Sequence, residues 1–87
     1  MADHRDFLER MQELNPSAAY PTGMEACIVG IGRRAAEPPL FVVSTARCIE
    51  HYMTADGMSR EDALEFFEYN CVSAFVGEGT PIFLEDC

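Results

Sequence analysis

The chain has 87 residues, 48% of them hydrophobic, and its 15 carboxylates against six basic side chains give a formal charge of −9 at pH 7. This length predicts one domain over residues 1–87, and the apolar fraction favours a packed core over a disordered chain. So negative a chain repels nucleic acid and anionic membranes, and we therefore expect no direct binding to either. The charge suits a protein partner with a basic surface.

The first half of the chain predicts a helix followed by two strands. Asp3 can cap a helix that runs to about Leu14, where an Asn-Pro pair stops it. The stretch EACIVGIG (25–32) has apolar residues on both faces, which is typical of a buried strand. Tandem prolines then forbid a helix, and LFVV (40–43) predicts a second strand, antiparallel to the first.

A second helix is expected directly after this strand. Ser44 is placed to cap it, and Gly57 follows its end, where a glycine commonly terminates a helix. We expect its inner face to carry Ile49, Tyr52 and Met53.

The third helix is expected to begin at Ser59, which has capping-box spacing to Asp62, and to run to about Val76. A third strand follows at Ile82–Leu84. The order α-β-β-α-α-β predicts an α+β fold, in which the second and third helices pack on a small, mostly antiparallel three-stranded sheet. The expected inner stripe of the third helix consists of Leu64, Phe67, Cys71, Ala74 and Phe75.

A second apolar face on the third helix carries Phe66, Tyr69 and Val72. A surface helix normally keeps one side polar, so this helix is either the central helix of the fold or contacts another subunit through its extra face, and we expect both. We expect a homo-oligomer, most simply a homodimer. Asn70 lies among these apolar residues, and we expect its amide to be buried and bonded to the backbone of a neighbouring loop.

Carboxylates form an acidic ridge along the third helix. One interpretation is a solvated face that also favours the helix N-terminus. The other is mimicry of a nucleic-acid phosphate track, in which the ridge occupies a basic groove on a partner protein. The ridge consists of Glu61, Asp62, Glu65 and Glu68, and Glu78 would extend it.

Motifs for catalysis or metal binding are weak. GIGRRA (30–35) matches the letters of a dinucleotide loop, but the prolines after it prevent the helix that such a site needs. Cys48 and His51 have the i,i+3 spacing of a nucleophile pair or of half a zinc site, but no further ligands or catalytic partners can be assigned. A buried cysteine beside a surface histidine is the simpler interpretation. We therefore expect no enzyme activity, no cofactor and no metal.

We also expect no targeting signal. The stretch MADHRDFLERM is charged and lacks the apolar core of a signal peptide, and no apolar run reaches the length of a membrane span. The four cysteines are widely spaced without a C-x-x-C pair, so we expect reduced thiols in a cytoplasmic protein.

Two motifs, DGMSREDALEFFEYN and VGEGTPIF, resemble those of a group of small phage and prophage proteins. The resemblance implies a phage or mobile-element origin and action in the cytoplasm of a bacterial host. Small acidic phage proteins include inhibitors of host defence, anti-CRISPR proteins among them. The residues that carry the resemblance are Asp56, Gly57, Met58, Asp62, Ala63, Phe67, Asn70, Gly77, Glu78, Thr80, Pro81 and Phe83.

Two hypotheses for the function follow. The first is a non-enzymatic binding protein that blocks a host defence complex of the CRISPR type by occupying its basic nucleic-acid-binding surface. The alternative is a homo-oligomeric structural or accessory phage protein without an inhibitory role.

Overall fold

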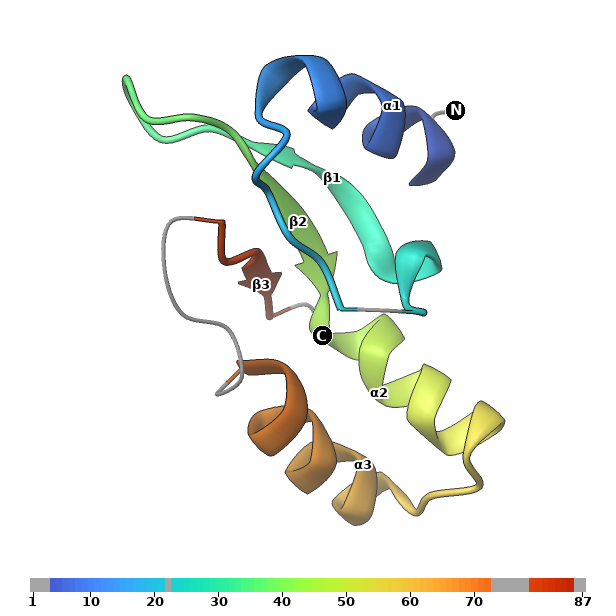
Figure 1. Ribbon diagram of the computed structural model, residues 1–87. Coiled ribbons are helices and arrows are strands. Elements are labelled where there is room, and N and C mark those ends of the chain that lie inside the picture. Colours follow the sequence, from blue (N-terminus) through green and yellow to red (C-terminus); the bar gives the residue numbers. More distant parts are fainter. Residues whose placement is uncertain (1–3, 22, 73–78, 86–87) are drawn as a thin grey trace.

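The computed structural model describes residues 4–21, 23–72 and 79–85, and over these ranges it confirms the α+β class and the predicted element order (Figure 1). Asp3, Ala74, Phe75, Val76, Gly77 and Glu78, together with the side chains of Cys71 and Val72, lie outside the described part. The elements are helix α1 (His4–Leu14), 3-10 helix η1 (Glu25–Cys27), strands β1 (Ile28–Gly32) and β2 (Leu40–Ser44), helices α2 (Thr45–Ala55) and α3 (Arg60–Phe67), π-helix η2 (Glu68–Val72) and strand β3 (Ile82–Leu84).

The sheet has the order β1-β2-β3 and is mixed. Strand β1 pairs antiparallel with β2, as expected, with Ile31 opposite Phe41. Strand β3 pairs parallel with β2, with Val43 beside Phe83. The short connection between β1 and β2 favours the antiparallel pairing, whereas β3 follows two helices and a long crossover can return a strand in parallel.

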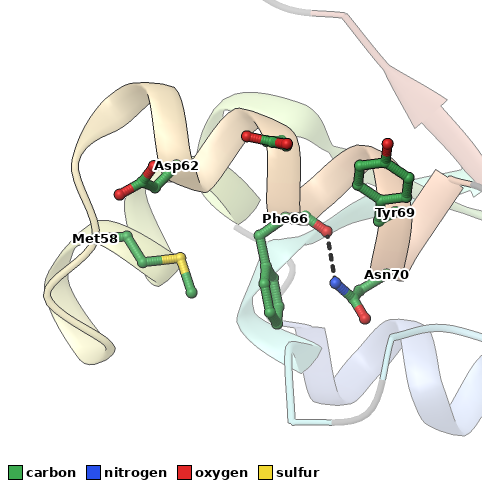
Figure 2. Close-up of a pocket in the computed structure, with 6 residues that line it drawn as sticks. Met58, Asp62, Phe66, Tyr69 and Asn70 are labelled. Atoms are coloured by element: carbon green, nitrogen blue, oxygen red, sulfur yellow. Dashed lines mark hydrogen bonds between the residues drawn. The ribbon is translucent and has the colours of Figure 1, made fainter.

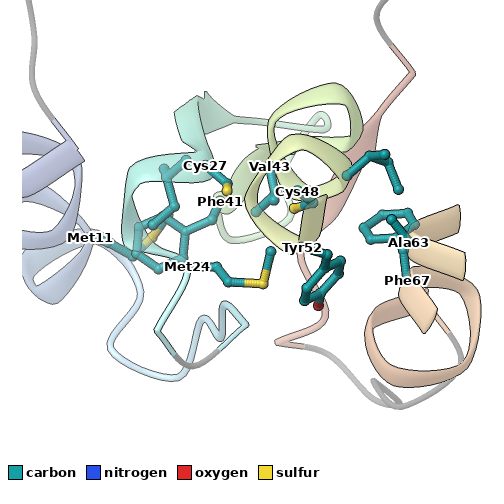
Figure 3. Packing of buried hydrophobic residues seen from close by; sticks show 11 residues of the cluster. Met11, Met24, Cys27, Phe41, Val43, Cys48, Tyr52, Ala63 and Phe67 are labelled. Carbon is teal, nitrogen blue, oxygen red and sulfur yellow. The ribbon is translucent and has the colours of Figure 1, made fainter. Parts of the chain in front are cut away.

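One face of the sheet carries the core. Val43 is fully buried and Phe83 packs against the core cluster, whereas the alternating positions Val42, Ile82 and Leu84 point to the other face. Ile82 and Leu84 are 41% and 43% exposed, so the outer face of this sheet edge is apolar and open. Figure 3 shows the core side, where residues from the helices meet the strands. The buried cluster is Met11, Met24, Cys27, Ile28, Phe41, Val43, Cys48, Ile49, Tyr52, Ala63 and Phe67.

The predicted strand at 25–32 begins later than expected. Its first three residues, Glu25–Cys27, form the 3-10 helix η1, and only Ile28–Gly32 is strand. The pairing with β2 is irregular between Ile28 and Gly30, where the register shifts. The 3-10 turn buries Cys27, whereas the apolar pattern alone does not separate a buried turn from a buried strand.

Side-chain caps fix the ends of the second and third helices as predicted. The Ser44 hydroxyl accepts a 3.1 Å hydrogen bond from the backbone N–H of Arg47, and the Ser59 hydroxyl accepts one of 3.2 Å from Asp62. Gly57 has a φ of +65°, in the left-handed region that favours glycine after a helix.

The predicted inner faces of these helices are correct in part. Ile49, Tyr52 and Phe67 are buried, as expected, but Met53 is 37% exposed and Leu64 is 40% exposed. On α3 the fully buried neighbour of Phe67 is Ala63 rather than Leu64. The helix is therefore rotated by about one residue from the predicted orientation, because a small side chain permits the close approach of α2 and α3.

The C-terminal strand is tied to the segment after α1. The backbone N–H of Ala19 donates a 2.9 Å hydrogen bond to the carbonyl oxygen of Gly79. A Cβ atom added at Gly79 would collide with the carbonyl oxygen of Ser17. The glycine at position 79 is thus explained by close backbone packing, which is a structural role.

Candidate functional site

The acidic ridge lies on the exposed side of α3 and continues into η2. Glu61, Asp62, Glu65 and Glu68 are all exposed. Within the described residues, none of these carboxylates lies within 4.0 Å of a basic side chain. The ridge therefore presents negative charge to solvent without neutralisation by the described part of its own chain.

A shallow pocket of about 380 Å³ lies beside the ridge and shares two of its carboxylates (Figure 2). Asp62, the pair Glu65 and Phe66, and the pair Tyr69 and Asn70 recur at spacings of three or four residues, which places them along one side of a helix, and Met58 lies in the connection before α3. We refer to this site as the aromatic–acid pocket, and it is lined by Met58, Asp62, Glu65, Phe66, Tyr69 and Asn70.

Phe66 and Tyr69 supply the aromatic surface of the pocket. The Phe66 ring meets Tyr52 of α2 in a T-shaped arrangement, with ring centroids 4.9 Å apart and planes at 71°. This contact holds Phe66 in place, although 38% of the residue remains exposed. Tyr69 is 71% exposed, and no ring contact to it is present within the described residues.

Asn70 is not buried, so the expectation of a buried amide bonded to a loop is wrong. Its Nδ2 donates a 3.1 Å hydrogen bond to the carbonyl oxygen of Phe66 within the same helical segment (Figure 2). The predicted α-helix changes at Glu68 to the π-helix η2, and this irregular turn carries Asn70, which lines the pocket.

Two buried thiols from distant parts of the sequence meet in the core. Cys27 ends η1 and Cys48 lies in α2, and both are free cysteines (Figure 3). A hydrogen bond from the Cys48 thiol lowers the pKa of Cys27, and the nearby Arg47 acts in the same direction, while burial and Glu25 oppose it.

The thiol of Cys48 is fully buried, whereas His51 is only partly buried and its ring contacts Tyr52. The position of Cys48 therefore agrees with the simpler interpretation of a buried cysteine beside a histidine near the surface. No spacing rule could have paired Cys27 with Cys48, because the contact arises only when η1 packs on α2.

The described residues offer neither a metal site nor a membrane-spanning helix. They contain no group of three or more His, Cys, Asp or Glu side chains placed to hold a metal ion. In the same part of the chain, no helix has both the length and the apolar character required to cross a bilayer.

The chain matches no protein-family model, no curated protein and no solved structure. The site therefore has to be interpreted from its own chemistry. Sequence reasoning assigned the carboxylates to partner binding and Phe66 and Tyr69 to an oligomer interface, but it missed that Asp62, Glu65 and both rings line one pocket. The helical spacing from Asp62 to Tyr69 was the signal that could have joined them.

Proposed function

We propose that this protein is a non-enzymatic binding protein of phage origin that acts in the cytoplasm of a bacterial host. In this proposal the acidic ridge occupies the basic, nucleic-acid-binding surface of a host defence complex of the CRISPR type. The observation that carries the proposal is the row of exposed carboxylates on α3, none of them paired with a cation of the described residues.

The size of the ridge supports this mode of binding. From Glu61 to Glu68 a helix rises about 10 Å, at about 1.5 Å per residue. Phosphates along one strand of a duplex follow at about 3.4 Å, so the ridge covers the length of about three of them. Exposed carboxylates contribute little to folding stability, but opposite a basic groove they steer association and fix its register.

The test is capture of a purified CRISPR-type effector complex by immobilised protein. We expect binding that weakens steeply with salt and that lowers the affinity of the complex for its nucleic acid. Charge reversal of Glu61, Glu65 and Glu68 to Lys should abolish capture while leaving the circular dichroism spectrum unchanged.

The matched control reverses three other exposed carboxylates, Glu9, Glu13 and Glu37, which lie on α1 and in the β1–β2 connection. Both triple variants change the net charge by the same amount. Loss of capture in the ridge variant alone would therefore assign binding to the ridge. If both variants bind like the original chain, the ridge is a solvated face and the proposal fails.

The second candidate is a homo-oligomeric structural or accessory phage protein without an inhibitory role. Two exposed apolar surfaces favour it: Phe66 and Tyr69 on the α3 side, and Ile82 and Leu84 on the open sheet edge. Light scattering at micromolar concentration should then give a dimer. Tyr69→Asp should yield a monomer if the α3 side forms the interface, and Leu84→Asp should do so if the sheet does.

A further inference from the structure

We propose that the aromatic–acid pocket binds the guanidinium group of an arginine side chain on the partner protein. This inference rests on the proposed function, and it names the group that the α3 face recognises. It also gives Phe66 and Tyr69 a role in partner binding, in place of the homo-oligomer contact expected from the sequence.

The aromatic side of the pocket suits a flat cation. Tyr69 is exposed over most of its surface, and Phe66 is held by the Tyr52 ring with 38% of the residue open to solvent. A guanidinium stacks on such rings through cation–π and planar contact, whereas an ammonium offers a compact, strongly hydrated point charge. Met58 lies at one end of the pocket and adds an adaptable apolar side chain (Figure 2).

The polar side of the pocket is rich in acceptor oxygens. The carboxylates of Asp62 and Glu65 lie one helical turn apart, and neither is paired with a cation of the described residues. One N–H of the Asn70 Nδ2 is used in the bond to the Phe66 carbonyl, and the Oδ1 of the same amide is an acceptor. A guanidinium carries five N–H donors in a planar fork, so it can satisfy several of these oxygens while it stacks on a ring.

None of the basic side chains of this chain lines the pocket. All six are arginines, at positions 5, 10, 33, 34, 47 and 60, and no lysine is present. The guanidinium of Arg47 donates instead to the carbonyl oxygen of Ala26, at 3.4 Å. Within the described residues no cation complements these carboxylates, and a basic protein surface offers arginine in the required form.

The test is a nuclear magnetic resonance titration with Nα-acetylarginine methylamide, with Nα-acetyllysine methylamide as the probe of equal charge. We expect the arginine probe to shift the ring resonances of Phe66 and Tyr69 and the side-chain amide of Asn70. Its affinity should exceed that of the lysine probe by about three- to tenfold. Equal affinities, or shifts confined to other residues, would overturn the inference.

Variants separate stacking from charge. Tyr69→Leu keeps an apolar side chain but removes the ring, so the affinities for the arginine probe and the lysine probe should become similar. Glu65→Gln should weaken the arginine probe by more than Glu61→Gln does, because both remove one carboxylate from α3 but only Glu65 lines the pocket. Equal losses would mean that general charge attraction alone holds the probe, which would also contradict the pocket.

This outcome can be separated from that of the proposed function. If the probes fail while capture of the effector complex still depends on Glu61, Glu65 and Glu68, the pocket inference fails alone. If the arginine probe binds in the pocket while the ridge reversal leaves capture intact, the proposed function fails alone.

Discussion

The side chain of Asn70 bonds to the carbonyl oxygen of Phe66, four residues earlier, at 3.1 Å. Both residues are exposed, and the bond spans the change from α3 to the π-helix η2. The amide thus satisfies a local backbone group in solvent instead of linking the helix to a distant loop. Such a bond contributes little to stability, because water replaces either partner at small cost.

Replacing Asn70 by Ala should therefore change the free energy of unfolding by no more than about 0.5 kcal/mol. Urea denaturation followed by circular dichroism measures this. Thr54→Ala is the matched control, since the Thr54 hydroxyl makes the same kind of exposed bond to the carbonyl oxygen of Glu50, at 3.0 Å. A loss of about 1–3 kcal/mol at Asn70 alone would mean that its amide is buried after all.

Phe67→Ala should lower the free energy of unfolding by about 3–5 kcal/mol, because it empties a fully packed site. Phe67 is 1% exposed and its ring meets Phe83 edge-on, with centroids 5.4 Å apart. Leu64→Ala on the same helix should cost less than about 1 kcal/mol, since Leu64 is 40% exposed. Chemical denaturation of both variants decides the orientation of α3, and similar losses at the two positions would contradict it.

Thr45→Val should raise the free energy of unfolding by about 1 kcal/mol. The Thr45 hydroxyl is buried and has no hydrogen-bond partner within the described residues, and a methyl group of the same size removes that cost. Thr45→Ser keeps the hydroxyl and loses a methyl group, so it should be destabilising by about 1 kcal/mol. Thermal and urea unfolding check the pair, and a destabilising Thr45→Val would reveal a partner for the hydroxyl.

The lowered pKa of Cys27 predicts a dependence of stability on pH. Its ordinary value is 9.0, so between the folded-state pKa and 9.0 the unfolded chain keeps a proton that the folded chain has lost. The contribution of Cys27 to stability therefore rises with pH, is complete above about pH 9, and is lost as the pH falls through the folded-state value.

The measurement is the difference in unfolding free energy between the original chain and Cys27→Ala, in urea with reductant, from about pH 6.5 to about pH 9.5. This difference should grow with pH. In a Cys48→Ala background the difference in unfolding free energy should increase less with pH, because the thiol that donates to Cys27 is gone. A difference that stays flat or falls with pH would contradict the lowered pKa.

The parts of the fold that were predicted correctly depend on neighbours in sequence. Ser44 and Ser59 cap their helices because a hydroxyl reaches a backbone N–H three residues on, and Gly57 ends α2 because it tolerates a positive φ. These contacts lie within one turn of chain, so the local pattern is enough to predict them.

The parts that were missed depend on tertiary packing. Helical periodicity placed Leu64 inside, but the contact with α2 favoured the small side chain of Ala63 at the interface. The direction of β3 and the meeting of Cys27 with Cys48 were equally out of reach, since both depend on how η1, α2 and α3 pack. The environment of Asn70 changed with the π-turn, for which no sequence signal was identified.

Ser44 is both the last residue of β2 and the N-cap of α2, so no linker separates the strand from the helix (Figure 1). Its side chain is fully buried, and β3 pairs with it in the sheet through Leu84. The direction in which α2 leaves the sheet is therefore fixed, and α3 packs on α2, where the Phe66 ring meets Tyr52. A partner that docks on α3 binds a surface whose orientation relative to the sheet is already restricted. Less conformational entropy is lost on binding, which lowers the entropic cost of association.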